Sequence, residues 1–167
     1  MNNRPLAITI LAVLNFIGGV GIILVQLLYS EQFNSTANEF GFSAGLLQVA
    51  IGFLGVIGVA SAIGMWTGKR WGWWLGAFYY CYAVFRYGNA IFAVFSLSDL
   101  LENSSRDLTY YISKNAFQLL LNALIVLYFF SKRALAWFKY DVLSKAKAIL
   151  LLLGINIFML IFIRVIS

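Results

Sequence analysis

Five long apolar runs, separated by short polar segments, form the main pattern along this chain. Within each run the apolar residues are continuous and do not alternate with polar ones, which favours α-helices over the strands of a membrane barrel. Each run fits the roughly 20 residues that a helix needs to cross a bilayer. The sequence therefore predicts an all-α bundle of transmembrane helices in one domain, residues 1–167, with spans at about 5–29, 45–66, 73–97, 112–131 and 148–166.

Small residues are concentrated in the second run, where Gly52, Gly55, Gly58, Ser61 and Gly64 follow one another at short intervals. In lipid no hydrophobic force brings helices together, so small side chains that let two backbones approach closely favour association. We expect this run to pack tightly against another helix.

The connecting segments alternate in charge along the chain. If the N-terminus is cytoplasmic, eight basic residues fall on the cytoplasmic side and three on the other. Because cytoplasmic segments carry the excess of Lys and Arg, this pattern predicts a cytoplasmic N-terminus and an extracytoplasmic C-terminus. The eight basic residues are Arg4, Lys69, Arg70, Lys132, Arg133, Lys139, Lys145 and Lys147.

Composition agrees with a membrane protein, since 62% of residues are hydrophobic, 11% are charged, and the mean hydropathy is +0.87. Soluble domains carry about 25% charged residues. A net charge of +6 can also indicate nucleic-acid binding, but here the basic residues flank the apolar runs. They predict contact with anionic lipids of the inner leaflet, no nucleic-acid partner, and a place in a bacterial inner (plasma) membrane.

Basic and aromatic residues mark two predicted cytoplasmic boundaries. The segment WTGKRWGWW at 66–74 indicates a tight turn whose tryptophans, Trp73 included, form a belt at the membrane interface. The segment FFSKRALAW at 129–137 repeats its aromatic residue, basic pair and later Trp after 63 residues. Either an internal duplication or the shared demands of inner boundaries accounts for this similarity.

The segment 132–147, between the last two spans, is basic, with Leu135 and Phe138 among its interleaved apolar residues. This pattern predicts a cytoplasmic amphipathic linker bound to anionic headgroups. The predicted headgroup anchors of both boundaries are Lys69, Arg70, Trp71, Lys132, Arg133 and Trp137.

Three segments carry a resemblance to known proteins: RPLAITIL at 4–11, GMWTGKRWGW at 64–73 and LYFFSKRALAWF at 127–138. In these segments the chain resembles small, uncharacterised prokaryotic integral membrane proteins with four helices. The resemblance covers roughly residues 4–138 and rests on boundary signals. It implies a helical membrane fold and carries no activity, and the fifth span and the basic linker depart from the four-helix plan.

The chain lacks the residues that several kinds of catalytic or cofactor site require. The chain has no His, and its one cysteine, Cys81, lies inside an apolar run, so haem, zinc and dithiol sites are not expected. No Asp or Glu lies inside an apolar run, although ion-coupled carriers usually place one there. We therefore expect a protein without catalytic residues, metal or cofactor, and not an enzyme.

Arg86 is the one charged residue near the middle of a predicted span. A central arginine costs about 2.5 to 3.5 kcal/mol on insertion scales, so it needs compensation. Three interpretations stay open: amide groups of neighbouring helices solvate it, a partner's carboxylate pairs with it, or it binds an anion or a lipid headgroup. The predicted polar seam consists of Tyr79, Tyr82, Arg86 and Asn89 on one helix face, with Gln118 and Asn122 of the fourth span.

Two functions from different classes follow from this seam. The first is a non-catalytic accessory or assembly subunit, which docks another membrane protein, or a second copy, through the small-residue face of the second span and through Arg86. The alternative is a passive channel, carrier or lipid- or anion-binding membrane protein that uses the polar seam.

Overall fold

The computed structural model describes residues 4–32, 35, 43–97, 105–140 and 144–166, and these ranges contain helices and no strand. The prediction of an all-α fold is therefore confirmed for the described chain. The predicted spans fall on the long helices, with boundaries that differ by up to seven residues. In chain order the helices are α1 (Leu6–Leu28), α3 (Ala44–Thr67), α4 (Arg70–Leu97), α5 (Ser105–Phe129), α6 (Lys132–Trp137) and α7 (Lys145–Ile166).

Three segments of these helices are long and apolar enough to cross a membrane: Leu6–Leu28, Gln48–Thr67 and Leu108–Phe129. Most of their surface is not covered by protein, and large exposed apolar side chains line α1, α3 and α5. These features are those of a membrane protein. The count of five spans and the orientation of the termini stay predictions.

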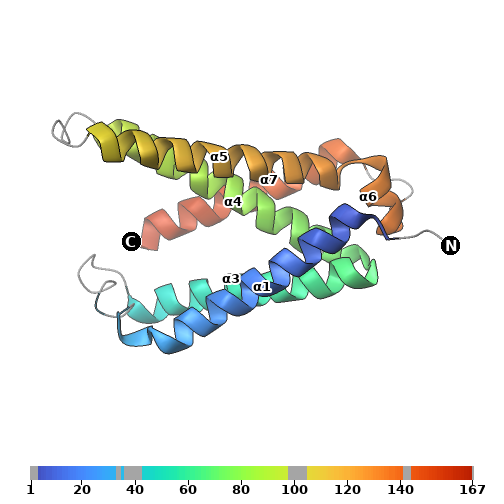
Figure 1. Cartoon of the computed structure of the whole chain (residues 1–167), viewed down its shortest axis with the longest axis horizontal. Helices are drawn as coiled ribbons and strands as arrows, with labels where there is room; N and C mark the ends of the chain where they lie inside the picture. Colours follow the sequence, from blue (N-terminus) through green and yellow to red (C-terminus); the bar gives the residue numbers. More distant parts are fainter. Residues whose placement is uncertain (1–3, 33–34, 36–42, 98–104, 141–143, 167) are drawn as a thin grey trace.

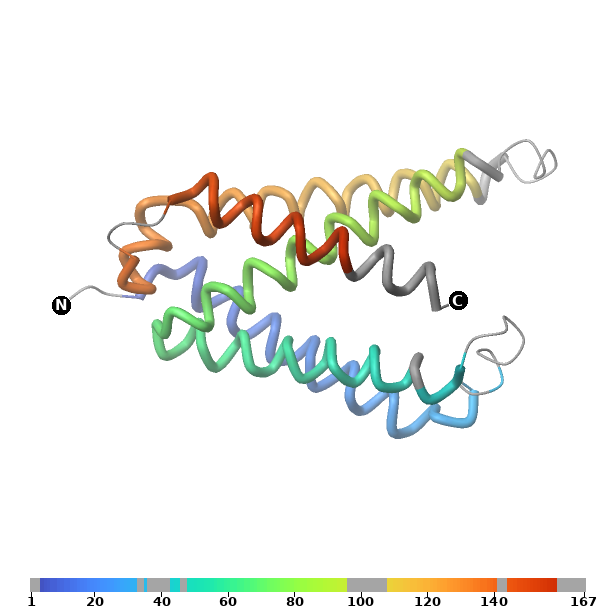
Figure 2. The backbone as a smooth tube through the Cα atoms, turned by 180° about the vertical axis from the view of Figure 1, so that it is seen from behind, coloured from blue at the N-terminus to red at the C-terminus, as the bar shows by residue number. Residues whose placement is uncertain are grey.

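The helices form two arms (Figure 1). One arm is the antiparallel pair α1–α3 and the other is the antiparallel pair α4–α5. The arms meet at one end and diverge toward the other, and α7 crosses α4 (Figure 2). We call the joined end the basic end, because it holds Lys69, Arg70, Lys132 and Arg133, and the opposite end the open end.

Glycines set the close approach of α1 to α3. A Cβ on Gly19 would lie 2.7 Å from the carbonyl oxygen of Gly55 and from the amide nitrogen of Val59. A Cβ on Gly58 would lie 3.1 Å from the Cα of Gly19. The expected tight packing of the second span is therefore confirmed, and its partner is α1 of the same chain.

The turn between α3 and α4 also depends on glycine. Gly68 ends α3 in the left-handed conformation, with φ 63°, and Lys69 then donates its amide hydrogen to the Gly64 carbonyl at 3.0 Å. This closes the last turn of the helix in the manner of a Schellman cap. Gly64 and Gly72 contact each other through their backbones, so α4 starts directly against the end of α3.

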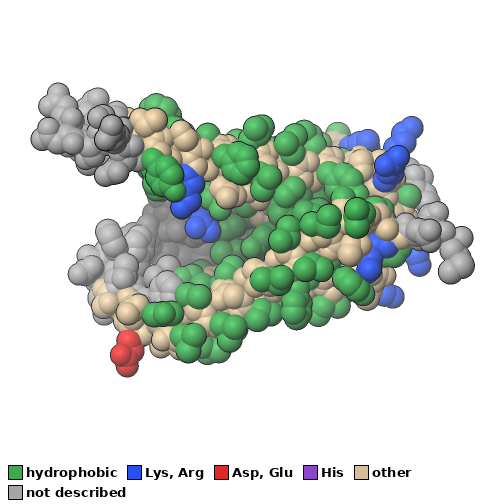
Figure 3. Space-filling model, viewed as in Figure 1, with side chains coloured by type: hydrophobic (Ala, Val, Ile, Leu, Met, Phe, Trp, Pro, Cys, Tyr) green, Lys and Arg blue, Asp and Glu red, His purple; other side chains and the backbone are tan. Residues whose placement is uncertain are grey.

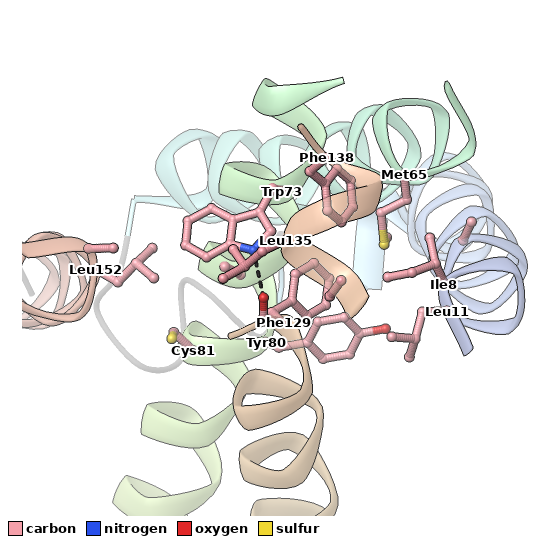
Figure 4. Packing of buried hydrophobic residues seen from close by; sticks show 14 residues of the cluster. Ile8, Leu11, Met65, Trp73, Tyr80, Cys81, Phe129, Leu135, Phe138 and Leu152 are labelled. Carbon is pink, nitrogen blue, oxygen red and sulfur yellow. Dashed lines mark hydrogen bonds between the residues drawn. The ribbon is translucent and has the colours of Figure 1, made fainter. Parts of the chain in front are cut away.

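The main core lies at the basic end, where both arms contribute (Figure 4). Phe129 of α5 stacks on Phe138, with ring centroids 6.2 Å apart, and Trp73 of α4 meets Phe130 edge to face at 5.3 Å. The largest fully buried apolar side chains are Trp73, Phe129, Phe138, Ile8, Met65 and Leu152.

Two sequence predictions are corrected here. Trp73 is not in an interfacial belt, because its side chain is fully buried in the core. In the predicted amphipathic linker, Leu135 and Phe138 are buried in protein and do not face lipid. The reason is that α6 folds back onto the ends of α4 and α5, which gives these apolar side chains a protein surface to cover. Residues 141–143 of the linker lie outside the described residues.

Replacement of Gly19 by alanine should destabilise the protein, because the new methyl group meets backbone atoms that cannot rotate away. We expect a loss of about 1 to 3 kcal/mol, as for other overpacked contacts, measured by thermal unfolding in mild detergent. Gly18→Ala is the matched control, since a Cβ there meets nothing within 4 Å. Equal stability of the two variants would contradict the described helix contact.

Candidate functional site

Two tryptophans bind helix-end carbonyls at the basic end. The indole N–H of Trp73 in α4 donates to the carbonyl oxygen of Phe129 at 2.8 Å, and the indole N–H of Trp137 in α6 donates to that of Met65 at 2.9 Å. Phe129 is the last residue of α5, where a helix carbonyl has no intrahelical partner, and the Met65 carbonyl, in the last turn of α3, also accepts the Gly68 amide hydrogen at 3.4 Å. The Trp73 bond therefore joins α4 to α5 within one arm, and the Trp137 bond links that arm, through α6, to α3 of the other arm.

The two similar segments 66–74 and 129–137 lie against each other in this arrangement. Trp73 comes from the first and binds Phe129 of the second. Trp137 comes from the second and binds Met65, one residue before the first. Trp137 also covers Gly68, where an added Cβ would lie 3.1 Å from its ring. The two similar segments therefore contact each other reciprocally, whether or not they arose by duplication.

A buried polar group connects three helices further along the arms. Asn15 of α1 donates to the Ser61 hydroxyl of α3 at 2.9 Å, and the Tyr80 hydroxyl of α4 donates to the Asn15 side-chain oxygen at 2.6 Å. Ser61 in turn donates to the Gly58 carbonyl at 2.9 Å. Each side chain of this triad is nearly inaccessible, at 6% exposed or less. The triad is a satisfied network, so it fixes the crossing of α4 over the α1–α3 arm.

Beyond this crossing, Arg86 lies on an exposed face of α4. Its guanidinium carbon is 5.7 Å from the ring centroid of Tyr87, which is a weak cation–π contact. Among the described residues, no hydrogen bond or ion pair satisfies this charge. Asn89, one helical turn further, is also exposed.

In the described chain, the α4 and α5 residues of the predicted polar seam are therefore not joined by hydrogen bonds. Asn122 is 7% exposed and its amide donates to the Gln118 carbonyl of its own helix at 2.6 Å. Tyr79 and Tyr82 are half-buried on α4, and Tyr79 packs edge to face on Tyr80 at 5.6 Å. The described chain shows no hydrogen bond between Arg86 and the amides of α5.

A hollow lies between the arms toward the open end, and Lys or Arg side chains of the α4–α5 arm border it (Figure 3). Among the residues of α4 and α5 whose side chains are described, Arg86 and Lys114 are the basic ones away from the basic end. The acidic residue whose side chain is described is Glu31, which lies at the tip of the other arm and is exposed. The hollow consequently has a positively charged wall with no described counter-charge.

The predicted headgroup anchors all lie at the basic end. Trp71 is 44% exposed, and Arg70 donates to the Lys139 carbonyl at 3.2 Å. Trp66 is 50% exposed and carries Arg4 over its ring, 3.8 Å from the centroid. Basic and aromatic side chains at one end of the molecule are typical of an interface with lipid headgroups. Contact with lipid stays a prediction. Lys69, Lys132 and Arg133 are exposed, while Trp137 is half-buried.

In the described part of the chain, no three His, Cys, Asp or Glu side chains lie together as metal ligands would. Comparison with family models, curated proteins and solved structures found no match for this chain. The resemblance to small prokaryotic four-helix proteins therefore stays a prediction, and the site has to be interpreted from its own geometry.

Sequence reasoning missed the pairing of Asn15 with Ser61 and Tyr80. Asn15 is a polar residue in an apolar run, but the sequence does not say which helix faces it. The burial of Trp73 was missed because a tryptophan beside basic residues at the end of a span is also typical of an interfacial belt. The available signal was its place between Gly72 and Gly76, since glycines on both sides leave room for another helix to approach.

Loss of the Trp73 indole donor should loosen the contact between α4 and the end of α5. Trp73→Phe keeps a large ring and leaves the buried Phe129 carbonyl without its partner, so we expect a loss of about 1 to 3 kcal/mol in thermal unfolding. Trp71→Phe is the control, because Trp71 is exposed on the same turn. A Trp73→Phe variant as stable as the control would show that this hydrogen bond does not stabilise the α4–α5 pair.

Proposed function

We propose that this chain is a non-catalytic accessory or assembly subunit of a membrane protein complex. In this proposal it crosses a bacterial inner membrane five times, with the basic end in the cytoplasm. The support is the distribution of charge: described Lys and Arg gather at the end that holds the N-terminus, while apolar side chains cover the flanks (Figure 3). Excess basic charge at one end is typical of the cytoplasmic side.

The exposed Arg86 is the observation that carries the docking proposal. Its charge lies near the middle of a long helix and has no described counter-charge. A carboxylate on a partner helix that enters the hollow would offset the cost of the charge and would accept two parallel hydrogen bonds from the guanidinium. The proposed partner is therefore a membrane protein with an Asp or Glu at membrane depth.

The docking surface differs from the one expected from the sequence. The small-residue face of α3 is covered by α1, so it is not available to a partner. The hollow between the arms takes its place. A second copy of this chain is a poor partner for Arg86, because no Asp or Glu lies inside its apolar runs.

A passive channel or carrier has weaker support. Asn122 is buried and its amide is bound within α5, so it does not extend the polar surface of Arg86 and Asn89 from α4 onto α5. An anion or a lipid headgroup at Arg86 would use the same guanidinium chemistry, and the experiment below separates it from a protein partner.

Arg86→Gln should lower recovery of the partner while it leaves the isolated protein as stable as before. Pull-down in mild detergent, with mass spectrometry of retained proteins and lipids, measures the first effect. We expect about a tenfold loss of one specific membrane protein, as for a broken charge pair. Lys69→Gln, which removes a charge at the basic end, should not change that recovery.

Two outcomes would contradict the proposal. If Arg86→Gln destabilises the purified protein, its charge is satisfied by neighbouring helices of its own chain. If the variant loses a phospholipid or small acid instead of a protein, the site binds an anion. A partner variant with Arg in place of its carboxylate, combined with Arg86→Asp, should restore recovery only if the two residues pair.

A further inference from the structure

A separate cavity of about 440 Å³ lies at the basic end, away from Arg86. It is an open pocket between the start of α1, the end of α5 and the short helix α6. Leu6 forms its apolar side, and Tyr128, Arg133 and Trp137 form its polar side. The lining residues are Pro5, Leu6, Ala7, Tyr128, Arg133, Ala136 and Trp137.

The charge that faces this cavity is positive. Arg133 is its one charged lining residue, and within the described chain it has no hydrogen bond or ion pair. The indole N–H of Trp137 is already bound to Met65, so this side chain offers only its ring to a ligand. The first turn of α1 borders the same space, and its N-cap, Pro5, supplies no side-chain cap to the free amides. The chemistry favours an anion that also has an apolar part.

The surroundings indicate where such an anion comes from. Leu6, which lines the cavity, is 75% exposed, and Ile10 one turn along α1 is 50% exposed. On the facing arm Leu127, next to Tyr128, is 67% exposed. The cavity therefore opens beside apolar surface of two helices that are long enough to cross a membrane. A free phosphate would use none of this apolar surface, whereas a phospholipid would cover it with an acyl chain.

We propose that this cavity binds one anionic phospholipid, with its phosphate on Arg133 and Tyr128 and an acyl chain along Leu6 and Ile10. The bound lipid joins α1 to α6, two elements that otherwise meet only through the core of the basic end. This inference does not rest on a partner at Arg86, since the two sites lie on different parts of the molecule.

The test is native mass spectrometry of the full chain released from nanodiscs that contain equal amounts of phosphatidylglycerol and phosphatidylcholine. The wild-type protein should retain one phosphatidylglycerol molecule. Arg133→Gln should lower that retention about tenfold, as expected for one lost charge-assisted contact. Lys132→Gln is the matched control, because it removes the same charge from the adjacent residue, which does not line the cavity.

Ala136→Phe provides a second variant that fills the cavity without any change of charge. It should also lose the lipid, provided that its thermal unfolding matches that of the wild type. Equal losses from Arg133→Gln and Lys132→Gln would overturn the proposal, since they would indicate a diffuse headgroup contact. Retention by Ala136→Phe would place the lipid elsewhere. Displacement of the lipid by millimolar inorganic phosphate would assign the site to a soluble anion.

Discussion

Helix ends leave carbonyl groups without intrahelical partners, and at the basic end indole N–H groups bind two of these carbonyls. Trp73 binds the carbonyl at the end of α5 within its own arm, and Trp137 of α6 binds a carbonyl in the last turn of α3 in the other arm. In a low-dielectric environment such a bond is strong, and a missing partner is costly. Since the arms diverge away from this junction, the position of everything further out depends on it.

The hollow and its charged wall are consequences of this junction. The Asn15–Ser61–Tyr80 triad sets the crossing of α4 over the first arm. Beyond that crossing α4 follows α5 and leaves α3, and the side chain of Arg86 in this outer half is exposed. A bundle closed along its whole length would have surrounded Arg86 with its own helices. The arrangement instead leaves the charge available to a partner, and it keeps the proposed lipid cavity at the opposite end of the molecule.

The sequence predicted the helices well, because continuous apolar runs can satisfy their backbone in lipid only as helices. It also predicted the tight packing of the second run from its glycines. It could not predict that α1 is the packing partner, since small residues do not specify what approaches them. Trp73, Leu135 and Phe138 were misplaced for a related reason: next to basic residues, an apolar side chain fits an interface and a protein core equally well. Only the return of α6 onto α4 and α5 decides between them.

The most direct test of the central claim is a photo-crosslinking residue at position 89, one helical turn from Arg86 and exposed on the same stretch of α4, in membranes of the native host. The account predicts a crosslink to a single other membrane protein, mapped to a helix that carries an Asp or Glu. Crosslinks confined to lipid, or to α1 and α3 of the same chain, would contradict it, because the hollow would then hold no partner.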